Sequence, residues 1–323
     1  MAGNFWEGKN VLVTGAAGMV GSHVSEALIS KGANVVALIR SRDPRSYFFM
    51  EGLDRKAVLA YCDLSDLSRI HGAVGRYGIE FVFHLGAQPI VATATANPYE
   101  TFRSNVTGTL NVVEAVHRSP SVKCAVVASS DKAYGKSDTL PYTEDMPMRG
   151  AATYEASKSC ADILALSYAR EYGLPLAVTR CSNIYGPGDL NFNRIIPGAI
   201  RAGLLGTPLK LRDDGKQVRE YLFVKDAVSA YLALAENISK ARGEAFNFGS
   251  GEHFNVLQIV EKVGKAMGTK IGVEVINTSK GEIPIQYLSS EKAKKAFGWK
   301  AQFRMDDGLG IAIPWYTKLL SNK

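Results

Sequence analysis

The chain has 323 residues, which is enough for one large domain or two of modest size. Charged residues make up 21% and hydrophobic residues 46% of it, a balance typical of a water-soluble globular protein. The net charge is +7, but no Lys/Arg run is interleaved with aromatic residues, so we expect no nucleic-acid partner. A mild positive bias suits an anionic small ligand equally well.

The four cysteines are scattered and form no Cys-x-x-Cys pair. This pattern favours reduced thiols over a disulfide framework or a metal site. No apolar run approaches the roughly 18 residues of a membrane-spanning helix, and the first ten residues lack the apolar core of a signal peptide. We therefore expect a cytoplasmic protein without a metal site or a membrane partner.

Strand-like runs alternate with helical patterns through the first 182 residues. Nearly continuous apolar strands separated by amphipathic helices indicate an α/β fold with a Rossmann-type, doubly wound parallel sheet covered on both faces. The expected strands cover 10–15, 34–39, 57–63, 80–86, 123–130 and 175–182, and the expected helices cover 19–30, 66–77, 99–118 and 153–172.

The stretch "TGAAGMVG" lies between the first expected strand and the first helix. Three glycines alone indicate only a turn, but in this position they match a dinucleotide-binding loop, whose backbone N–H groups approach a pyrophosphate. The glycines are Gly15, Gly18 and Gly21, and the expected contacts of the loop are Gly15, Ala17, Gly18, Met19 and Val20.

The second strand ends on Arg40, where a carboxylate would indicate NAD. Without that carboxylate, Arg40 together with Arg42 or Arg45 favours the 2′-phosphate of NADP. Asp43 could still reach back to a ribose, so NAD stays as the alternative, and Arg40 could also be a solvated surface residue.

Two later strand ends add candidate cofactor contacts. Asp63 and Leu64 follow the third strand and are placed to meet an adenine ring, although Asp63 could instead cap the next helix. Leu85 and Ala87 follow the fourth strand, and Gln88 lies where such loops approach the nicotinamide ribose and a substrate.

The fifth strand ends in "SSDKAYG", which puts Ser130, Asp131 and Lys132 at the edge of the core. Downstream, "YEASK" puts Tyr154 and Lys158 on one face of a helix. A lysine ammonium about 4 Å away contributes up to roughly 4 kcal/mol toward the phenolate, so we expect it to lower the pKa of Tyr154. Tyr154 then takes a proton from an alcohol while a hydride goes to the cofactor.

After residue 182 the pattern loosens into a segment rich in Gly, Pro and Asn. Segments near 221–250 again resemble sheet-domain material, and helices are expected near 255–267, 289–297 and 305–320. We expect a dinucleotide-binding domain of residues 1–182 with return segments near 221–250. Residues 183–220 and 251–323 then form a smaller α/β cap that binds the substrate.

The motifs quoted above, with "RCSNIYGPG", "VREYLFVKDAV" and "EAFNFGSG", resemble the extended short-chain dehydrogenase/reductases that act on nucleotide sugars. Within that group the chain resembles nucleotide-sugar 4,6-dehydratases, particularly CDP-glucose 4,6-dehydratase-like proteins. The resemblance covers nearly the whole chain. It implies a Rossmann domain, a nucleotide-sugar-binding cap and a homodimer formed through a four-helix interface.

The resemblance also implies roles at the fifth strand. Ser130 hydrogen-bonds the oxygen on sugar carbon 4, and Asp131 protonates the hydroxyl that leaves carbon 6. Its pKa would have to rise for that role. Lys132 departs from the glutamate of the glucose dehydratases; it takes the proton from carbon 5 or stabilises an enolate. The alternative is that Asp131 and Lys132 form a surface ion pair without chemistry.

By the same resemblance, Asn183 and Arg219 hold the substrate diphosphate, and Arg194 adds a second cation unless it lies on a helix surface. The function expected is therefore conversion of an NDP-hexose to an NDP-4-keto-6-deoxyhexose. A 4-epimerase, a 4-keto reductase, a dehydratase that releases a 5,6-ene and a non-catalytic dinucleotide sensor are the alternatives.

Overall fold

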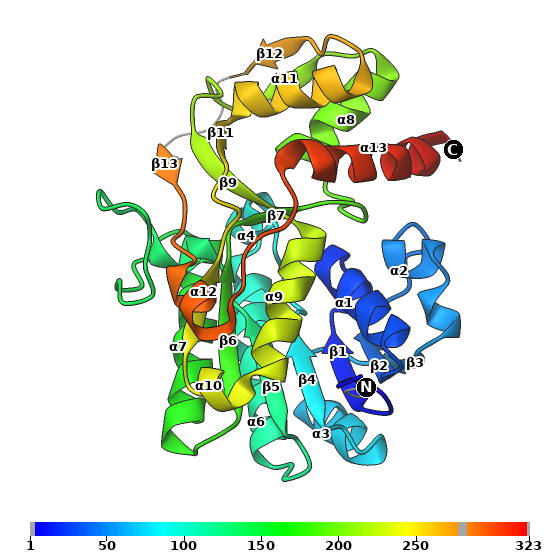
Figure 1. Ribbon diagram of the computed structural model, residues 1–323, viewed down its shortest axis with the longest axis vertical. Coiled ribbons are helices and arrows are strands. Elements are labelled where there is room, and N and C mark those ends of the chain that lie inside the picture. Colours follow the sequence, from blue (N-terminus) through cyan, green and yellow to red (C-terminus); the bar gives the residue numbers. More distant parts are fainter. Residues whose placement is uncertain (1–3, 277–282, 322–323) are drawn as a thin grey trace.

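The computed structural model describes residues 4–276 and 283–321, and within them a seven-stranded sheet forms the centre of the molecule (Figure 1). All of its strand pairs are parallel. The strand order is β10-β6-β5-β4-β1-β2-β3, so the sheet is doubly wound from β1 in both directions. Its strands are β1 (Asn10–Thr14), β2 (Asn34–Ile39), β3 (Val58–Tyr61), β4 (Phe81–His84), β5 (Cys124–Ala128), β6 (Leu176–Cys181) and β10 (Ala245–Phe248).

Helices cover both faces of this sheet, which is why its central strands are mostly apolar. One face packs against α1 (Met19–Ser30) and α9 (Val224–Glu236), and the other against α3 (Leu67–Arg76), α6 (Gly108–His117) and α7 (Thr153–Glu171). The short elements around them are α2 (Tyr47–Met50), η1 (Leu53–Arg55), η3 (Asp131–Tyr134), α10 (Ile238–Ala241) and α12 (Glu291–Phe297). The expected fold class is confirmed.

The expected helix at 99–118 is wrong as a single element. The chain forms α5 (Pro98–Phe102), a π-helical turn η2 (Arg103–Thr107) and then α6, with a separate α4 (Val91–Ala96) before them. Pro98 starts α5 because a first-turn proline has no N–H that needs a partner, and the Asn97 side chain caps this start by accepting from Glu100 N.

A second, smaller layer lies at the carboxyl ends of the main strands (Figure 1). Its strands are β7 (Asn183–Tyr185), β9 (Val218–Phe223), β11 (His253–Asn255) and β13 (Ile285–Gln286), and β8 (Leu209–Leu211) pairs with β12 (Val273–Val275). Helices α8 (Ile195–Leu205), α11 (Val256–Met267) and α13 (Met305–Ser321) enclose an apolar core with these strands.

Strand β9 of the small sheet leads without a break into helix α9 of the large sheet, because Phe223 is both the last strand residue and the N-cap of the helix. The two layers are therefore tied by a continuous segment as well as by packing. The expected domains also include residues 1–3, 277–282 and 322–323, which lie outside the described residues.

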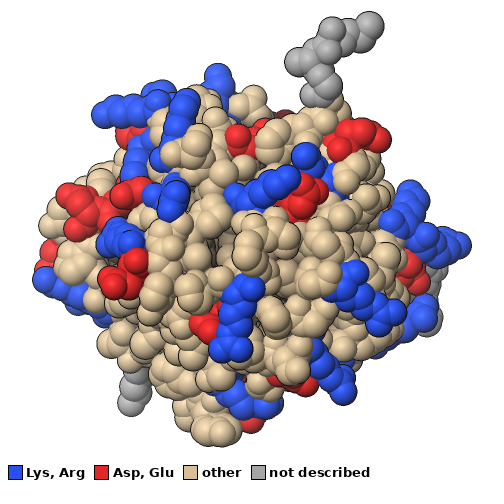
Figure 2. All heavy atoms as spheres, turned by 90° about the horizontal axis from the view of Figure 1, so that it is seen from below, with Lys and Arg blue, Asp and Glu red and all other residues tan. Residues whose placement is uncertain are grey.

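The surface opposite the small layer carries Lys and Arg side chains mixed with Asp and Glu (Figure 2). This face has no dense patch of one sign, in keeping with the dispersed charge of the sequence. Among the described residues, no helix has both the length and the apolar character needed to cross a membrane. All four cysteines fall within the described residues, and each is a free thiol.

Candidate active site

A cavity of about 830 Å³ lies between the carboxyl ends of the main strands and the small layer. The structure brings every predicted site residue to its wall. These residues are Gly15, Ala17, Gly18, Met19, Val20, Arg40, Asp63, Leu64, Leu85, Ala87, Gln88, Ser130, Asp131, Lys132, Tyr154, Lys158, Asn183, Arg194 and Arg219.

The glycine loop is as tight as a phosphate-binding turn requires. Gly15 has a φ of +65°, and a Cβ placed there would lie 2.6 Å from the Cα of Gly86. A Cβ on Gly21 would lie 2.2 Å from the carbonyl oxygen of Gly15. Helix α1 begins directly after Gly18, which offers no side chain to its first N–H groups. These donors and the helix dipole suit an anion at this end of the cavity.

Two buried hydroxyls show that the cavity suits a polar ligand. Ser129 and Ser182 follow β5 and β6 on the cavity wall, and neither Oγ has a hydrogen-bond partner among residues 4–276 and 283–321. A buried polar atom without a partner costs free energy unless a ligand or water satisfies it. Together with the glycine loop, these hydroxyls fit a dinucleotide that runs along the strand ends.

The three arginines after β2 are not equivalent. Arg40 is exposed and lines the cavity, whereas Arg42 lies 3.8 Å from Asp54 and stacks on a phenyl ring outside it. Arg45 makes a two-pronged ion pair with Asp43, with a contact of 2.9 Å. Neither of these two arginines, nor Asp43, lines the cavity. Arg40 is therefore the arginine of this loop at the expected adenosine end.

Asp63 shapes its own turn as well as the cavity. Its Oδ1 accepts from the N–H of Ser65 at 2.9 Å and from the Ser65 hydroxyl at 2.7 Å, and these bonds lower the pKa of Asp63. The alternative that Asp63 caps the next helix is wrong, because Asp66 is the N-cap and accepts from Arg69 N.

A buried histidine holds the loop that follows β4. Thr109 donates to the carbonyl of Asn105 at 2.6 Å, so its oxygen accepts from His84 Nε2 at 3.0 Å. Nδ1 of His84 must then accept from the Thr14 hydroxyl at 2.8 Å, and Thr14 in turn accepts from the Leu85 N–H at 3.1 Å. Burial lowers the pKa of His84 to about 3, so the imidazole is neutral.

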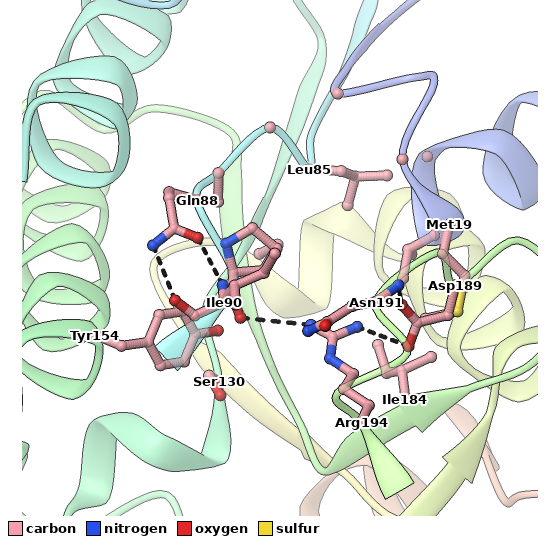
Figure 3. Close-up of a pocket in the computed structure, with 18 of the residues that line it drawn as sticks. Met19, Leu85, Gln88, Ile90, Ser130, Tyr154, Ile184, Asp189, Asn191 and Arg194 are labelled. Atoms are coloured by element: carbon pink, nitrogen blue, oxygen red, sulfur yellow. Dashed lines mark hydrogen bonds and ion pairs between the residues drawn. The ribbon is translucent and has the colours of Figure 1, made fainter. Parts of the chain in front are cut away.

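The side chain of Gln88 forms hydrogen bonds within its own loop. Its Oε1 accepts from Ile90 N at 2.6 Å, and its Nε2 donates to the Ile90 carbonyl at 3.0 Å (Figure 3). Nε2 also donates to Thr101 at 3.2 Å. Its backbone N–H donates to Asn105 Oδ1 at 2.7 Å. The residue lines the cavity as predicted, but these bonds engage both ends of its amide and shape the wall.

Tyr154 and Lys158 project from α7 toward the cavity, but they do not interact as expected. Lys158 Nζ donates to the carbonyl of Ala128 at 2.8 Å, and burial lowers the pKa of Lys158 to about 8. Burial also raises the pKa of Tyr154, and the groups that oppose this rise are Arg194 and the adjacent Ser130 hydroxyl (Figure 3). The expectation that Lys158 lowers the pKa of the phenol is therefore wrong in this structure.

Asp131 and Lys132 meet on the cavity wall and not on the outer surface, with the Lys132 side chain 19% exposed. The Asp131 side chain is 3% exposed; its Oδ1 accepts from Ser130 Oγ at 3.1 Å, and its Oδ2 lies 3.3 Å from Lys132 Nζ. Lys132 Nζ also donates to Gln286 Oε1 at 2.5 Å. Burial lowers the pKa of Lys132, against the opposing charge of Asp131.

The three predicted diphosphate ligands come from the small layer and the segment leading to it. Asn183 donates to the carbonyl of Glu220 at 3.0 Å. Arg194 lies 3.0 Å from Asp189 and donates to a backbone oxygen across the cavity mouth at 3.4 Å (Figure 3). Arg219 donates to the carbonyl of Val218 at 2.9 Å. The small layer and the segment leading to it thus add two cations, Arg194 and Arg219, to the wall of the cavity.

Residues 11–249 of the chain match the model of one protein family, the NAD dependent epimerase/dehydratase family. The matched range contains the glycine loop together with Ser130, Tyr154 and Lys158. The chain belongs to this family. It is an enzyme of the nicotinamide-dependent type, and the resemblance to the extended short-chain dehydrogenase/reductases is confirmed.

Its relatives in the family include enzymes of different reaction types. A CDP-glucose 4,6-dehydratase of Salmonella typhimurium is 29% identical over 97% of this chain and 92% of the relative. A UDP-glucose 4-epimerase of Corynebacterium glutamicum is 30% identical over 90% of each chain. The matches to trifunctional plant relatives span 47% of those proteins' length.

Among solved structures, a dTDP-glucose 4,6-dehydratase of Streptomyces venezuelae with NAD bound superimposes with a TM-score of 0.87. The two chains are 25% identical, over 96% of this chain and 97% of the other. The relatives as a whole establish the family and the fold. They do not separate dehydratase from epimerase.

For this member of the family, sequence patterns missed several residues of the site. Gln286 stands in a strand of two residues, 154 positions from its partner Lys132, and no periodicity marks it. Asp189, Arg212 and Tyr231 were missed too, and these three line the cavity, whereas Gln286 contacts Lys132 without lining it. Arg212 had a usable signal, because it is a cation only seven residues before the predicted Arg219 in the same segment.

Proposed function

We propose that the protein is a nucleotide-sugar 4,6-dehydratase, which converts an NDP-hexose to an NDP-4-keto-6-deoxyhexose. The observation that carries the proposal is the contact between the buried Asp131 and the partly buried Lys132 beside Ser130 and Tyr154, all on the wall of one cavity. Oxidation of a sugar needs only a base at the hydroxyl. Elimination of water needs a further acid and a further base, and the pair supplies both types of group.

The oxidation at carbon 4 uses the groups nearest the cofactor site. Tyr154 takes the proton of the carbon-4 hydroxyl, and Ser130 hydrogen-bonds the same oxygen. The bound nicotinamide supplies the hydride acceptor and later the hydride donor, and its positive charge in the oxidised form favours the phenolate of Tyr154. Lys158 donates to the carbonyl of Ala128, and this bond ties helix α7 to the end of β5 beside the site.

The 3.3 Å contact explains how an acid and a base coexist at residues 131 and 132. Moving one proton from Nζ to Oδ2 turns an ion pair into a carboxylic acid and a neutral amine without exchange with solvent. These are the forms that elimination requires: the amine takes the proton from carbon 5, which the carbon-4 ketone has made acidic, and the acid protonates the leaving hydroxide. Burial of Lys132 favours its neutral form.

The protons balance over a turnover. Lys132 delivers one of the three protons of its ammonium group to carbon 5 when hydride reaches carbon 6, and the proton that Tyr154 took from the carbon-4 hydroxyl replaces the one that Asp131 lost. Only water leaves. The pair therefore starts each cycle in the same protonation state.

Arg219, Arg194 and Asn183 on the cavity wall support a bound diphosphate, because guanidinium groups match phosphate oxygens. We propose the matching division of labour: residues 1–182 with 221–250 bind the dinucleotide, and 183–220 with 251–323 bind the nucleotide sugar.

The choice between NADP and NAD rests on the adenosine end. Arg40 on the cavity wall, with no carboxylate at the end of β2, supports NADP. The family description and the NAD-bound relative support NAD. We propose NADP binding through Arg40, with NAD as the alternative, and comparison of the two dissociation constants decides between them.

A 4-epimerase is the second candidate, and relatives of that activity occur at similar identity. It needs Tyr154 and the cofactor but neither an acid nor a base at carbons 5 and 6. In that case Asp131 and Lys132 remain an ion pair that only shapes the wall.

The test is to incubate the purified protein with CDP-, GDP-, dTDP- and UDP-hexoses in the presence of NAD or NADP. We expect a product that has lost one water and absorbs ultraviolet light in base, as 4-keto-6-deoxy sugars do. Asp131→Asn should lower its formation roughly 100-fold or more, whereas Asp138→Asn, a matched change at an exposed loop residue, should not. Absence of product with all four sugars, or equal turnover by Asp131→Asn, contradicts the dehydratase.

We also propose a homodimer formed through α5 and α7. Tyr99, Phe102 and Ile163 leave apolar side chains exposed there, with Tyr99 74% and Ile163 57% accessible. Sedimentation of the wild type as a dimer and of Ile163→Asp as a monomer is the expected result.

The free thiols further support a cytoplasmic location.

A further inference from the structure

Gln286, a residue of the small layer, hydrogen-bonds both Asp131 and Lys132. It lies on β13 of the small layer, and no part of it is exposed. Its Nε2 donates to the backbone carbonyl of Asp131 at 2.9 Å, and its Oε1 accepts from Lys132 Nζ at 2.5 Å. A buried amide with both ends bonded to adjacent residues of a catalytic strand end is a specific arrangement, because each misplaced end would leave a polar atom unpaired.

The first of these bonds fixes the direction of the second. A backbone carbonyl can only accept, so the NH₂ of Gln286 must face Asp131. The amide oxygen is then the atom that faces Lys132, and it can only accept. Lys132 must therefore direct one N–H to Gln286 in both its charged and its neutral form.

We propose that Gln286 is a positioning residue for the elimination step, which sets the rotation of Lys132 Nζ. Asp131 Oδ2 fixes one direction at Nζ and Gln286 Oε1 fixes a second. Proton transfer to Oδ2 leaves the lone pair of Nζ in the first of these directions, and the bond to Gln286 keeps the remaining N–H groups out of it. Once the Oδ2–H turns to the hydroxyl on carbon 6, this lone pair is free to take the proton from carbon 5. This inference rests on the proposed dehydratase.

The strand that carries Gln286 also relates it to the substrate end of the cavity. In the parallel pairing of β13 with β9, Gln286 is the register partner of Arg219. Two residues further along, Leu288 N donates to the buried carboxyl of Glu220 at 2.9 Å. The proposed diphosphate ligand and the residue that orients Lys132 thus lie side by side on paired strands, so a diphosphate that orders β9 also orders β13.

Two variants test the role. Gln286→Met keeps the shape and removes both hydrogen bonds, whereas Gln286→Glu keeps the acceptor and adds a negative charge. Ile285→Met changes the neighbouring strand residue, whose side chain is 44% exposed, and serves as the control. We expect Gln286→Met to lower the rate of solvent deuterium incorporation at carbon 5 by 10- to 100-fold. Reduction of the cofactor by the sugar should change less than threefold.

The apparent pKa of Lys132 is the second readout, measured by competitive amine labelling and mass spectrometry in the absence of any sugar. The charged groups that face Lys132 are Asp131, Arg219 and Glu155, and none of them changes in these variants. Gln286→Glu should raise the pKa of Lys132 by at least one unit, because it adds a carboxylate, and Gln286→Met should lower it.

The outcomes separate this inference from the proposed function. If no sugar is turned over but the Lys132 pKa shifts as stated, the orienting contact stands and the dehydratase proposal fails. If the wild type is a dehydratase and both Gln286 variants match Ile285→Met in deuterium incorporation and in the Lys132 pKa, the positioning role is refuted. Should Gln286→Met not fold, Gln286→Glu alone decides through the pKa.

Discussion

Lowering the pH from 8 to 5 should act on the buried His84 in a way that can be measured. The folded pKa of His84 is about 3, below the ordinary value of 6.5. The unfolded chain therefore binds a proton first as the pH falls, and the stability that the neutral imidazole provides above pH 6.5 is lost progressively toward pH 3. Between pH 8 and pH 5 this amounts to about 2 kcal/mol of unfolding free energy, at 1.36 kcal/mol per pH unit.

A second buried group opposes this loss. Burial raises the pKa of Glu220 to about 7 from 4.5, so its stabilising contribution is complete below pH 4.5 and is lost as the pH rises through 7. From pH 8 to pH 5 the protein regains about 2.5 kcal/mol from Glu220. The two effects nearly cancel in the wild type, whose own pH dependence therefore conceals both.

The assay compares urea unfolding of the wild type, His84→Gln and Glu220→Gln at pH 8 and pH 5. The stability difference between the wild type and His84→Gln should shrink by about 2 kcal/mol on going to pH 5, since only the wild type loses the imidazole contribution. The corresponding difference for Glu220→Gln should change in the opposite direction. A difference between the wild type and His84→Gln that is the same at both pH values would refute the neutral, doubly bonded imidazole.

Three further changes probe the rest of the site. Gly21→Ala should weaken NAD and NADP binding at least tenfold, as followed by nicotinamide fluorescence, because the new Cβ would lie 2.2 Å from the Gly15 oxygen; unchanged binding would show that the loop yields. Arg40→Ala should weaken NADP about tenfold and leave NAD nearly unchanged in the same titration, and equal losses would argue against a 2′-phosphate contact. Asp162→Asn should cost about 3–5 kcal/mol in urea unfolding, since it leaves the guanidinium of Arg180 buried without its 2.9 Å partner; a smaller loss would mean that water reaches the charge.

The fold was predictable because its signals are local. Apolar runs bounded by glycine and helical periodicity locate the strands at 34–39 and 176–181 and the helix at 153–171 to within a residue or two. The π-turn at 103–107 was not predictable, because the residues around it read as uninterrupted helix. The two-residue strand at 285–286 is too short to carry any period.

The site was predictable where one motif supplies the residue. Ser130 and Asp131 line the cavity because the carboxyl ends of parallel strands meet at one edge, and Tyr154 reaches the same wall from the first turn of α7. Burial was not predictable: the phenol of Tyr154 was expected to have a lowered pKa, but its desolvation outweighs the nearby charges. Gln286 could not be found, since the contact depends on how a distant segment returns to the sheet.

The edge strand β10 has a consequence for how the enzyme is made. The other six strands of the main sheet lie within the first 181 residues, so a nascent chain can assemble them while the small layer is still being synthesised. Asn247 of β10 accepts from the Tyr134 hydroxyl at 2.7 Å, and Tyr134 in turn accepts from Arg180 at 2.8 Å. These bonds fix the turn that carries Asp131, the proposed acid, and they can form only after residue 247 emerges from the ribosome. The turn that carries Asp131 therefore gains its full set of hydrogen bonds late in translation.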